Sequence, residues 1–112
     1  MDKRALKRIP TDIAIEYYLW NPLVWKKLYT GSINNLSEQG MHIRTKTVLF
    51  PLDSLLEISI PSDSGVISLP AKVSNIVWRN VLPDNTCDSM GIELSNPPSA
   101  YLDLVAHLRS DV

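Results

Sequence analysis

Residues 28–47 have the sequence LYTGSINNLSEQGMHIRTKT, which predicts two β-strands joined by a turn. The two strand-like runs are residues 28–34 and 41–47. Between them, Asn35-Leu36-Ser37-Glu38-Gln39-Gly40 forms the pattern NxSxxG, and asparagine, serine and glycine are residue types that turns recruit. The stretch therefore predicts a hairpin whose tip carries an amide, a hydroxyl and a backbone position without a side chain.

The same alternation of apolar and polar residues recurs along the chain. In the second run of the hairpin it places Met41, Ile43 and Thr45 on one face and His42, Arg44 and Lys46 on the other. Turn signals separate the strand-like runs from one another. The further runs are residues 12–20, 55–60, 66–79 (interrupted by Pro70) and 90–94, and a polar loop is predicted at residues 80–86.

The C-terminal segment changes to helical periodicity. Asn96 is a suitable helix cap, Pro97 suits the first helical position, and apolar residues follow at helical spacing. No βαβ alternation is present, which disfavours a doubly wound nucleotide-binding fold. The predicted class is mainly β, a small six- to seven-stranded antiparallel β-barrel closed or plugged by one C-terminal α-helix.

Length, charge and cysteine content limit the function classes. A chain of 112 residues with net charge −1 is one domain and no general polyanion binder. One cysteine, Cys87, allows no intramolecular disulfide and indicates a reducing compartment. Apolar runs fall short of the roughly 18 residues that a membrane span needs, so a cytoplasmic location is expected.

Basic residues gather at the N-terminus. Four of the eleven lie in the first eight positions, and Arg4-Ala5-Leu6-Lys7-Arg8 forms an RxxxR pattern. A guanidinium is planar, always charged and able to pair two donors with two acceptors, which suits phosphate and the O6/N7 edge of guanine. Two arginines four positions apart can converge on one compact ligand. We expect residues 1–10 to form a flexible basic arm and residues 11–112 the barrel domain.

An RxxxR followed by an NxSxxG ahead of β-rich sequence resembles the PilZ family, which binds the bacterial second messenger cyclic di-GMP. The late strand Gly91-Ile92-Glu93-Leu94 also resembles a strand typical of that family. The resemblance implies that Arg4 and Arg8 contact phosphate and guanine. It further implies that Asn35, Ser37 and Gly40 surround a guanine, with Gly40 free to adopt φ > 0 and to let the backbone approach a ring.

The resemblance implies a receptor without enzymatic activity or cofactor, whose arm wraps over cyclic di-GMP and thereby signals to a downstream protein partner. Lys3 and Arg79 are weaker ligand-binding candidates. The segment Trp20–Trp25 is longer and more apolar than a minimal hairpin connection. It is therefore a candidate partner surface. The sequence leaves open the partner, the affinity and whether one or two cyclic di-GMP molecules bind.

Two other interpretations stay open. The chain could be a PilZ-type adaptor that binds no ligand and acts through protein contacts. It could also be a barrel that binds single-stranded nucleic acid, although 7% aromatic residues and net charge −1 disfavour this. No pattern supports catalysis or a metal site, because His42 and His107 lack companions at metal-ligand spacing and are expected on the surface.

Overall fold

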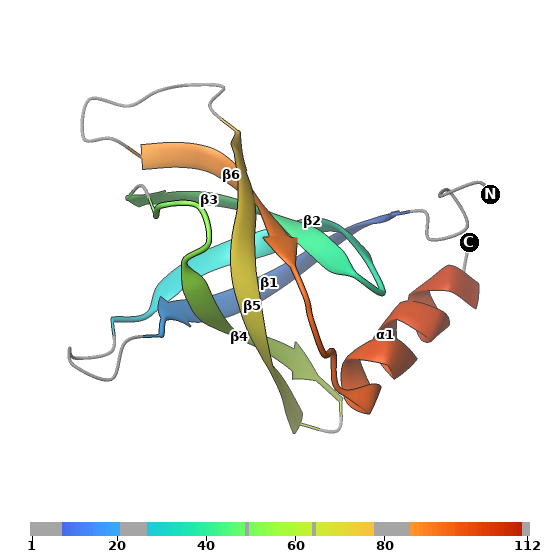
Figure 1. The fold of residues 1–112 in the computed structure, drawn as a ribbon. Helices are drawn as coiled ribbons and strands as arrows, with labels where there is room; N and C mark the ends of the chain where they lie inside the picture. Colours follow the sequence, from blue (N-terminus) through green and yellow to red (C-terminus); the bar gives the residue numbers. More distant parts are fainter. Residues whose placement is uncertain (1–7, 21–26, 49, 64, 78–85, 111–112) are drawn as a thin grey trace.

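The computed structural model describes residues 8–20, 27–48, 50–63, 65–77 and 86–110. Within this part of the chain six strands form a closed antiparallel barrel, followed by one helix (Figure 1). The elements are β1 (Ile9–Leu19), β2 (Tyr29–Ser37), β3 (Gly40–Val48), β4 (Leu55–Ser62), β5 (Gly65–Val77), β6 (Thr86–Glu93) and α1 (Ser99–Ser110). The predicted fold class is confirmed.

The barrel closes through pairing between β1 and β4. The strand order is β1-β2-β3-β6-β5-β4, and every neighbouring pair is antiparallel. In β3 the predicted alternation holds, since Met41, Ile43 and Thr45 are buried whereas Arg44 is exposed. Alternate residues of each strand thus fill one interior, as the period of two requires.

Within the described residues, a pair of hydroxyls lies among the apolar side chains of the interior. The Oη of Tyr17 and the Oγ1 of Thr45 are 2.8 Å apart, and both residues are almost fully buried. Thr45 Oγ1 also lies 3.2 Å from the carbonyl oxygen of Thr30, to which it donates. The threonine proton is committed to that carbonyl, so Tyr17 is the donor in the pair. Each of the two buried hydroxyls therefore has a hydrogen-bond partner, and neither is left unpaired in the core.

The helix α1 covers the end of the barrel where the turn between β2 and β3 lies (Figure 1). Tyr101 and Val105 are fully buried and join the barrel core. The helix begins at Ser99, two residues later than predicted, because the carbonyl of Pro98 accepts the first helical hydrogen bonds from Tyr101 and Leu102. Asn96 and Pro97 therefore precede the helix, and the predicted cap is wrong.

Details of β1, β6 and β5 also differ from the prediction. Ile9 and Pro10 belong to β1 and pair with β2, so the barrel begins before residue 11. Cys87 lies in β6. Pro70 does not interrupt β5, because the pairing of β5 with β6 extends only as far as Lys72, so no partner on that side needs the N–H that proline lacks.

Candidate functional site

One residue of each sequence motif lies at the start of β1, Arg8 of RxxxR and Asn35 of NxSxxG. Arg8 directly precedes β1, and Asn35 lies on β2 opposite Pro10. The Nη1 of Arg8 donates a hydrogen bond of 2.9 Å to the Oδ1 of Asn35. Since the asparagine is neutral, the hydrogen bond orients the guanidinium without cancelling its charge. The arginine is thus held in place and keeps its attraction for an anion.

Ser37 ends β2 and stabilises the turn that follows. Its side chain is buried, and its Oγ accepts a hydrogen bond of 3.3 Å from the backbone N–H of Gln39. The turn itself comprises Glu38 and Gln39, so Asn35 and Ser37 belong to the strand. The observed turn is therefore shorter than the predicted one, which covered the whole NxSxxG pattern.

Gly40 is required by the close approach of β6. A Cβ at position 40 would lie 2.2 Å from the carbonyl oxygen of Ile92, a separation that no side chain tolerates. The expected φ > 0 does not occur at Gly40; the glycine with positive φ in the described residues is Gly65. The last residue of NxSxxG is thus needed for the pairing of β3 with β6, in which Gly40 is opposite Glu93.

We expect Gly40→Ala to lower the free energy of unfolding by about 2–3 kcal/mol, because the added methyl forces two backbones apart. The matched control is Gly91→Ala. A Cβ there would lie 3.1 Å from the Cβ of Asn75 and 3.3 Å from the Nε2 of His42, so the neighbours need to move by only a few tenths of an ångström, far less than the 2.2 Å contact at position 40 requires. Urea denaturation measures both variants. Equal losses for the two would contradict the backbone clash as the reason for Gly40.

A groove of about 500 Å³ connects these residues. This volume lies within the roughly 300–1,000 Å³ typical of small-molecule sites. Its walls come from the start of β1, the turn after β2, β5 and the end of β6. The lining residues are Arg8, Ser37, Gln39, Gly40, Ser74, Ile92, Glu93 and Leu94. The groove therefore brings together Arg8, Ser37 and Gly40, and Asn35 is hydrogen-bonded to Arg8.

Sequence reasoning missed Gln39, Ser74 and Glu93. Gln39 lies inside NxSxxG, so the motif itself could have indicated that Gln39 is close to the groove. Ser74 and Glu93 come to the groove only through the pairing of distant strands, which the sequence does not indicate locally. The Oγ of Ser74 donates to the carbonyl of Gly91 at 3.2 Å. Glu93 forms an ion pair of 3.3 Å with Lys72, which offsets its negative charge beside the groove. Lys3, Arg4 and Arg79 lie outside the described residues.

The helix α1 contacts the turn between β2 and β3 through two side chains, Tyr101 near its start and Arg109 near its end. The Oη of the buried Tyr101 donates to the carbonyl of Ser37 at 2.7 Å and lies 3.4 Å from that of Gly40. Burial raises the pKa of Tyr101, with the Glu38 carboxylate adding to the shift and Arg8 opposing it, so the hydroxyl stays a donor at neutral pH. Arg109 forms an ion pair of 2.6 Å with Glu38. The turn is thereby fixed to the rest of the fold.

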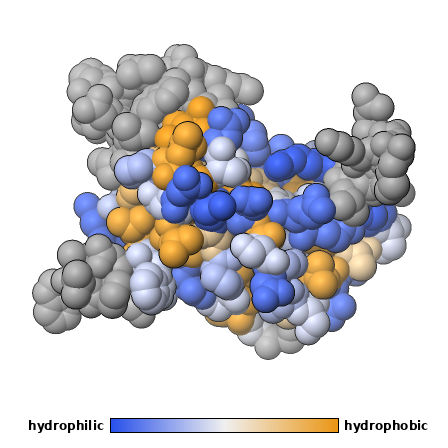
Figure 2. All heavy atoms as spheres, in the orientation of Figure 1, coloured by the Kyte–Doolittle hydropathy of each residue, from blue (hydrophilic) through white to orange (hydrophobic). Residues whose placement is uncertain are grey.

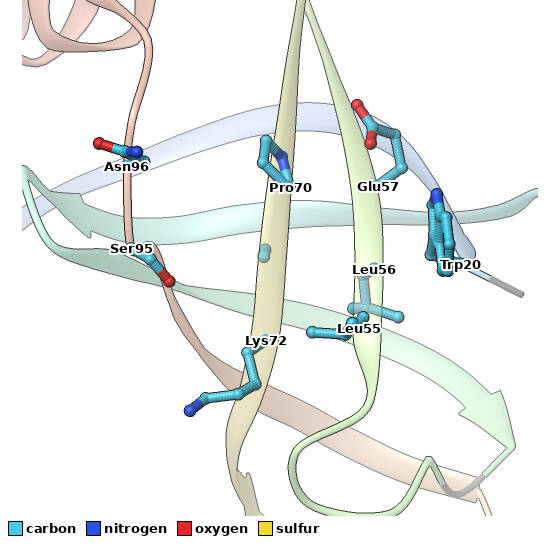
Figure 3. Close-up of a pocket in the computed structure, with 9 residues that line it drawn as sticks. Trp20, Leu55, Leu56, Glu57, Pro70, Lys72, Ser95 and Asn96 are labelled. Carbon is cyan, nitrogen blue, oxygen red and sulfur yellow. The ribbon is translucent and has the colours of Figure 1, made fainter.

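A second groove, of about 290 Å³, is mainly apolar (Figure 3). Trp20 and Leu55 line it with about half of their surfaces exposed, and Pro70 on β5 lies opposite Glu57 on β4. Its cation, Lys72, is already paired with Asp53 and Glu93. Hydrophobic side chains also appear between hydrophilic ones over the molecular surface (Figure 2). This second groove suits an apolar partner better than a phosphate.

Metal and membrane features are absent from the described residues. No group of three His, Cys, Asp or Glu side chains there is arranged to hold a metal ion. In the same part of the chain, no helix has the length and apolar character needed to cross a bilayer.

A scan against protein families matches the PilZ domain over residues 2–109. The chain belongs to the PilZ domain family. The match spans both sequence motifs, all six strands and nearly all of α1. A search of curated proteins finds no match.

Solved PilZ domains share this fold. The chain is similar to the PilZ domain with c-di-GMP of YcgR from Escherichia coli, with a TM-score of 0.69, 16% identity, and coverage of 98% of this chain and 94% of that one. It is also similar to the PilZ domain of CeSA from a cellulose synthesizing bacterium, with a TM-score of 0.66, 17% identity, and coverage of 91% and 97%. At this identity the likeness shows the common PilZ fold.

Proposed function

We propose that this PilZ domain is a receptor for cyclic di-GMP and has no enzymatic activity of its own. The observation that carries the proposal is the hydrogen bond between Arg8 and Asn35 beside the groove lined by Ser37 and Gly40. This contact unites the RxxxR and NxSxxG motifs at one place. The choice of ligand is supported by the similar PilZ domain of YcgR, whose structure was solved with c-di-GMP.

The residues divide the recognition of the ligand between them. Arg4 and Arg8 bind phosphate and the edge of a guanine, because a guanidinium offers charge and paired donors. Asn35, Ser37 and Gly40 surround a guanine, with the amide supplying both a donor and an acceptor. Lys3 and Arg79 are secondary candidates for contacts to the same ligand.

Binding changes the surface of the domain near the start of β1. Arg8 is already held at the groove by Asn35. We infer that the ligand draws Arg4 to the same place and orders the segment before Arg8 against the barrel. A downstream protein partner reads the altered surface. The boundary of the moving segment lies before Ile9, because Ile9 is buried in the core.

Isothermal titration with cyclic di-GMP tests the proposal. Arg4→Ala and Arg8→Ala should each weaken binding by about 1.5–3 kcal/mol, or roughly ten- to a hundredfold, through lost charge-assisted hydrogen bonds. Arg44→Ala is the matched control, because Arg44 is exposed on β3 but does not line the groove. Absence of heat with the wild-type protein, or equal losses for Arg8→Ala and Arg44→Ala, would contradict the site.

The exposure of Trp20 favours a second candidate function. Trp20 is 52% exposed beside Leu55 at 53%, at the edge of the second groove. An adaptor that binds another protein would use such a surface. The remaining residues of the proposed Trp20–Trp25 surface lie outside the described residues. No heat and no change in melting temperature with cyclic di-GMP would favour this adaptor over the receptor.

A further inference from the structure

A row of polar residues crosses the outer face of the barrel from the proposed site. Asn35 on β2 is paired with His42 on β3, and His42 is paired with Gly91 on β6. Gly91 is in turn paired with Asn75 on β5. His42 is therefore the next residue after Asn35 in this row, one strand further from Arg8. It is also two positions beyond Gly40 along β3, on the same face.

Gly91 has no side chain, and the ring of His42 partly fills the space that this leaves in the row. A Cβ at position 91 would lie 3.3 Å from the Nε2 and 3.6 Å from the Cδ2 of His42. It would also lie 3.1 Å from the Cβ of Asn75. Gly91 is buried although it belongs to the outward-facing residues of β6. The imidazole edge thus covers the glycine backbone, which fixes where the ring lies beside the site.

The imidazole is available for a new contact. His42 is only partly buried, and no hydrogen bond to its ring is found within the described residues. A neutral imidazole has one donor and one acceptor nitrogen, whereas the protonated ring has two donors. Neighbouring Asn35 is already engaged by Arg8 through its Oδ1. The ring is therefore a further polar group that a ligand at Arg8 and Asn35 can reach.

The charges around His42 favour the neutral ring in the unliganded protein. Burial lowers the pKa of His42, and the positive charge of Arg8 lowers it further. Arg44 follows His42 on the same face of β3, and Glu93, paired with Lys72, follows Gly91 on β6. The facing residues on β2 and β5, Asn35 and Asn75, carry no charge. An anion bound at Arg8 would reverse the balance.

We propose that His42 is an additional ligand-binding residue, which takes up a proton from solvent when an anionic nucleotide binds beside Arg8 and Asn35. This inference rests on the proposed function, since it assigns a further contact to the ligand proposed to bind at Arg8 and Asn35, the residue with which His42 is paired. The added proton turns the ring into a cation with two N–H donors, suited to a phosphate oxygen. The phosphodiester groups and the guanidinium of Arg8 keep their charges throughout, so His42 is the group that changes.

The sign of the pH dependence follows from linkage. Binding raises the pKa of His42 from its lowered value in the free protein. Affinity is therefore constant above the ligand-bound pKa, rises as the pH falls through the interval between the two values, and is constant again below the free pKa. A rise of one unit on binding corresponds to about a tenfold gain in affinity at low pH.

The test is titration calorimetry with cyclic di-GMP between about pH 5.5 and pH 8, where histidine titrates. Each titration is run in two buffers with different heats of ionisation, so that proton uptake is measured directly. We expect wild-type affinity to rise about tenfold over this range, with net proton uptake. His42→Gln, which keeps a donor and an acceptor but cannot be protonated, should bind with little pH dependence and no uptake.

The Glu93→Gln variant shows whether the proton is taken up by His42 or by Glu93, the carboxylate that lines the groove. It should retain the proton uptake of the wild-type protein, whereas His42→Gln should lose it. Equal pH profiles for wild type and His42→Gln, with binding intact in both, would overturn the role of His42 and leave the receptor function standing. Absence of binding by the wild-type protein at every pH would overturn both.

Discussion

Replacing both Arg4 and Arg8 by alanine is expected to abolish measurable binding of cyclic di-GMP. In the proposed site each guanidinium is expected to contribute about 1.5–3 kcal/mol through charge-assisted hydrogen bonds, so the pair together should contribute about 3–6 kcal/mol. This is roughly a hundred- to ten-thousandfold in affinity. Titration calorimetry measures the loss, and urea denaturation of the unliganded protein should show nearly unchanged stability, because Arg8 is exposed.

The double lysine variant gives the matched comparison. Arg4→Lys with Arg8→Lys retains both positive charges but loses the planar fork that pairs two donors with two acceptors. It should bind more tightly than the double alanine variant and more weakly than the wild-type protein. Binding by the double alanine variant that equals the wild type would show that the ligand site lies elsewhere on the barrel.

Tyr101→Ala is expected to lower the free energy of unfolding by about 3–5 kcal/mol. The ring of Tyr101 is fully buried between the helix and the barrel, and its hydroxyl donates to the carbonyl of Ser37. The substitution therefore removes core packing and leaves a buried carbonyl without this donor. Urea denaturation followed by tryptophan fluorescence measures the change.

Two further variants separate the ring of Tyr101 from its hydroxyl. Tyr101→Phe keeps the packing and should lose only about 1 kcal/mol, the typical net value of one hydrogen bond. Leu102→Ala, at a neighbouring helix position that is 39% exposed, should lose less than Tyr101→Ala. If Tyr101→Ala and Leu102→Ala destabilised the protein equally, Tyr101 could not be the main anchor of the helix.

The strands could be predicted because their alternation is local. Met41, Ile43 and Thr45 face the interior, as the sequence pattern requires. The limits of the strands were harder to predict, because Asn35 and Ser37 are turn-forming residue types that here continue β2. Tertiary pairing with β1 and β3 outweighed their local preference.

The candidate site was predictable only in part. The residue types and spacing of the two motifs indicated the candidate residues, and Arg8 is hydrogen-bonded to Asn35 in the structure. The contacts of Tyr101 with Ser37, and of His42 with Gly91, join residues far apart in the chain. No local pattern encodes such pairs. Gly40 shows the same limit, because its requirement comes from the carbonyl of Ile92 on another strand.

The closure of the barrel restricts how a partner can recognise this protein. Each of the six strands is paired with a neighbour on both sides, with β4 and β1 completing the ring. Adding a β-strand at an open edge is the mode by which many domains capture extended peptides. Within the described residues, such a strand finds unpaired backbone where a pairing stops short, as along β5 before Lys72 on the side of β6 and along β1 before Glu16 on the side of β4. Where the strands are paired on both sides, recognition must use side chains that project from the barrel or the helix. Under the proposed receptor function, a signal produced by the ligand would pass to such a partner through surface shape and charge.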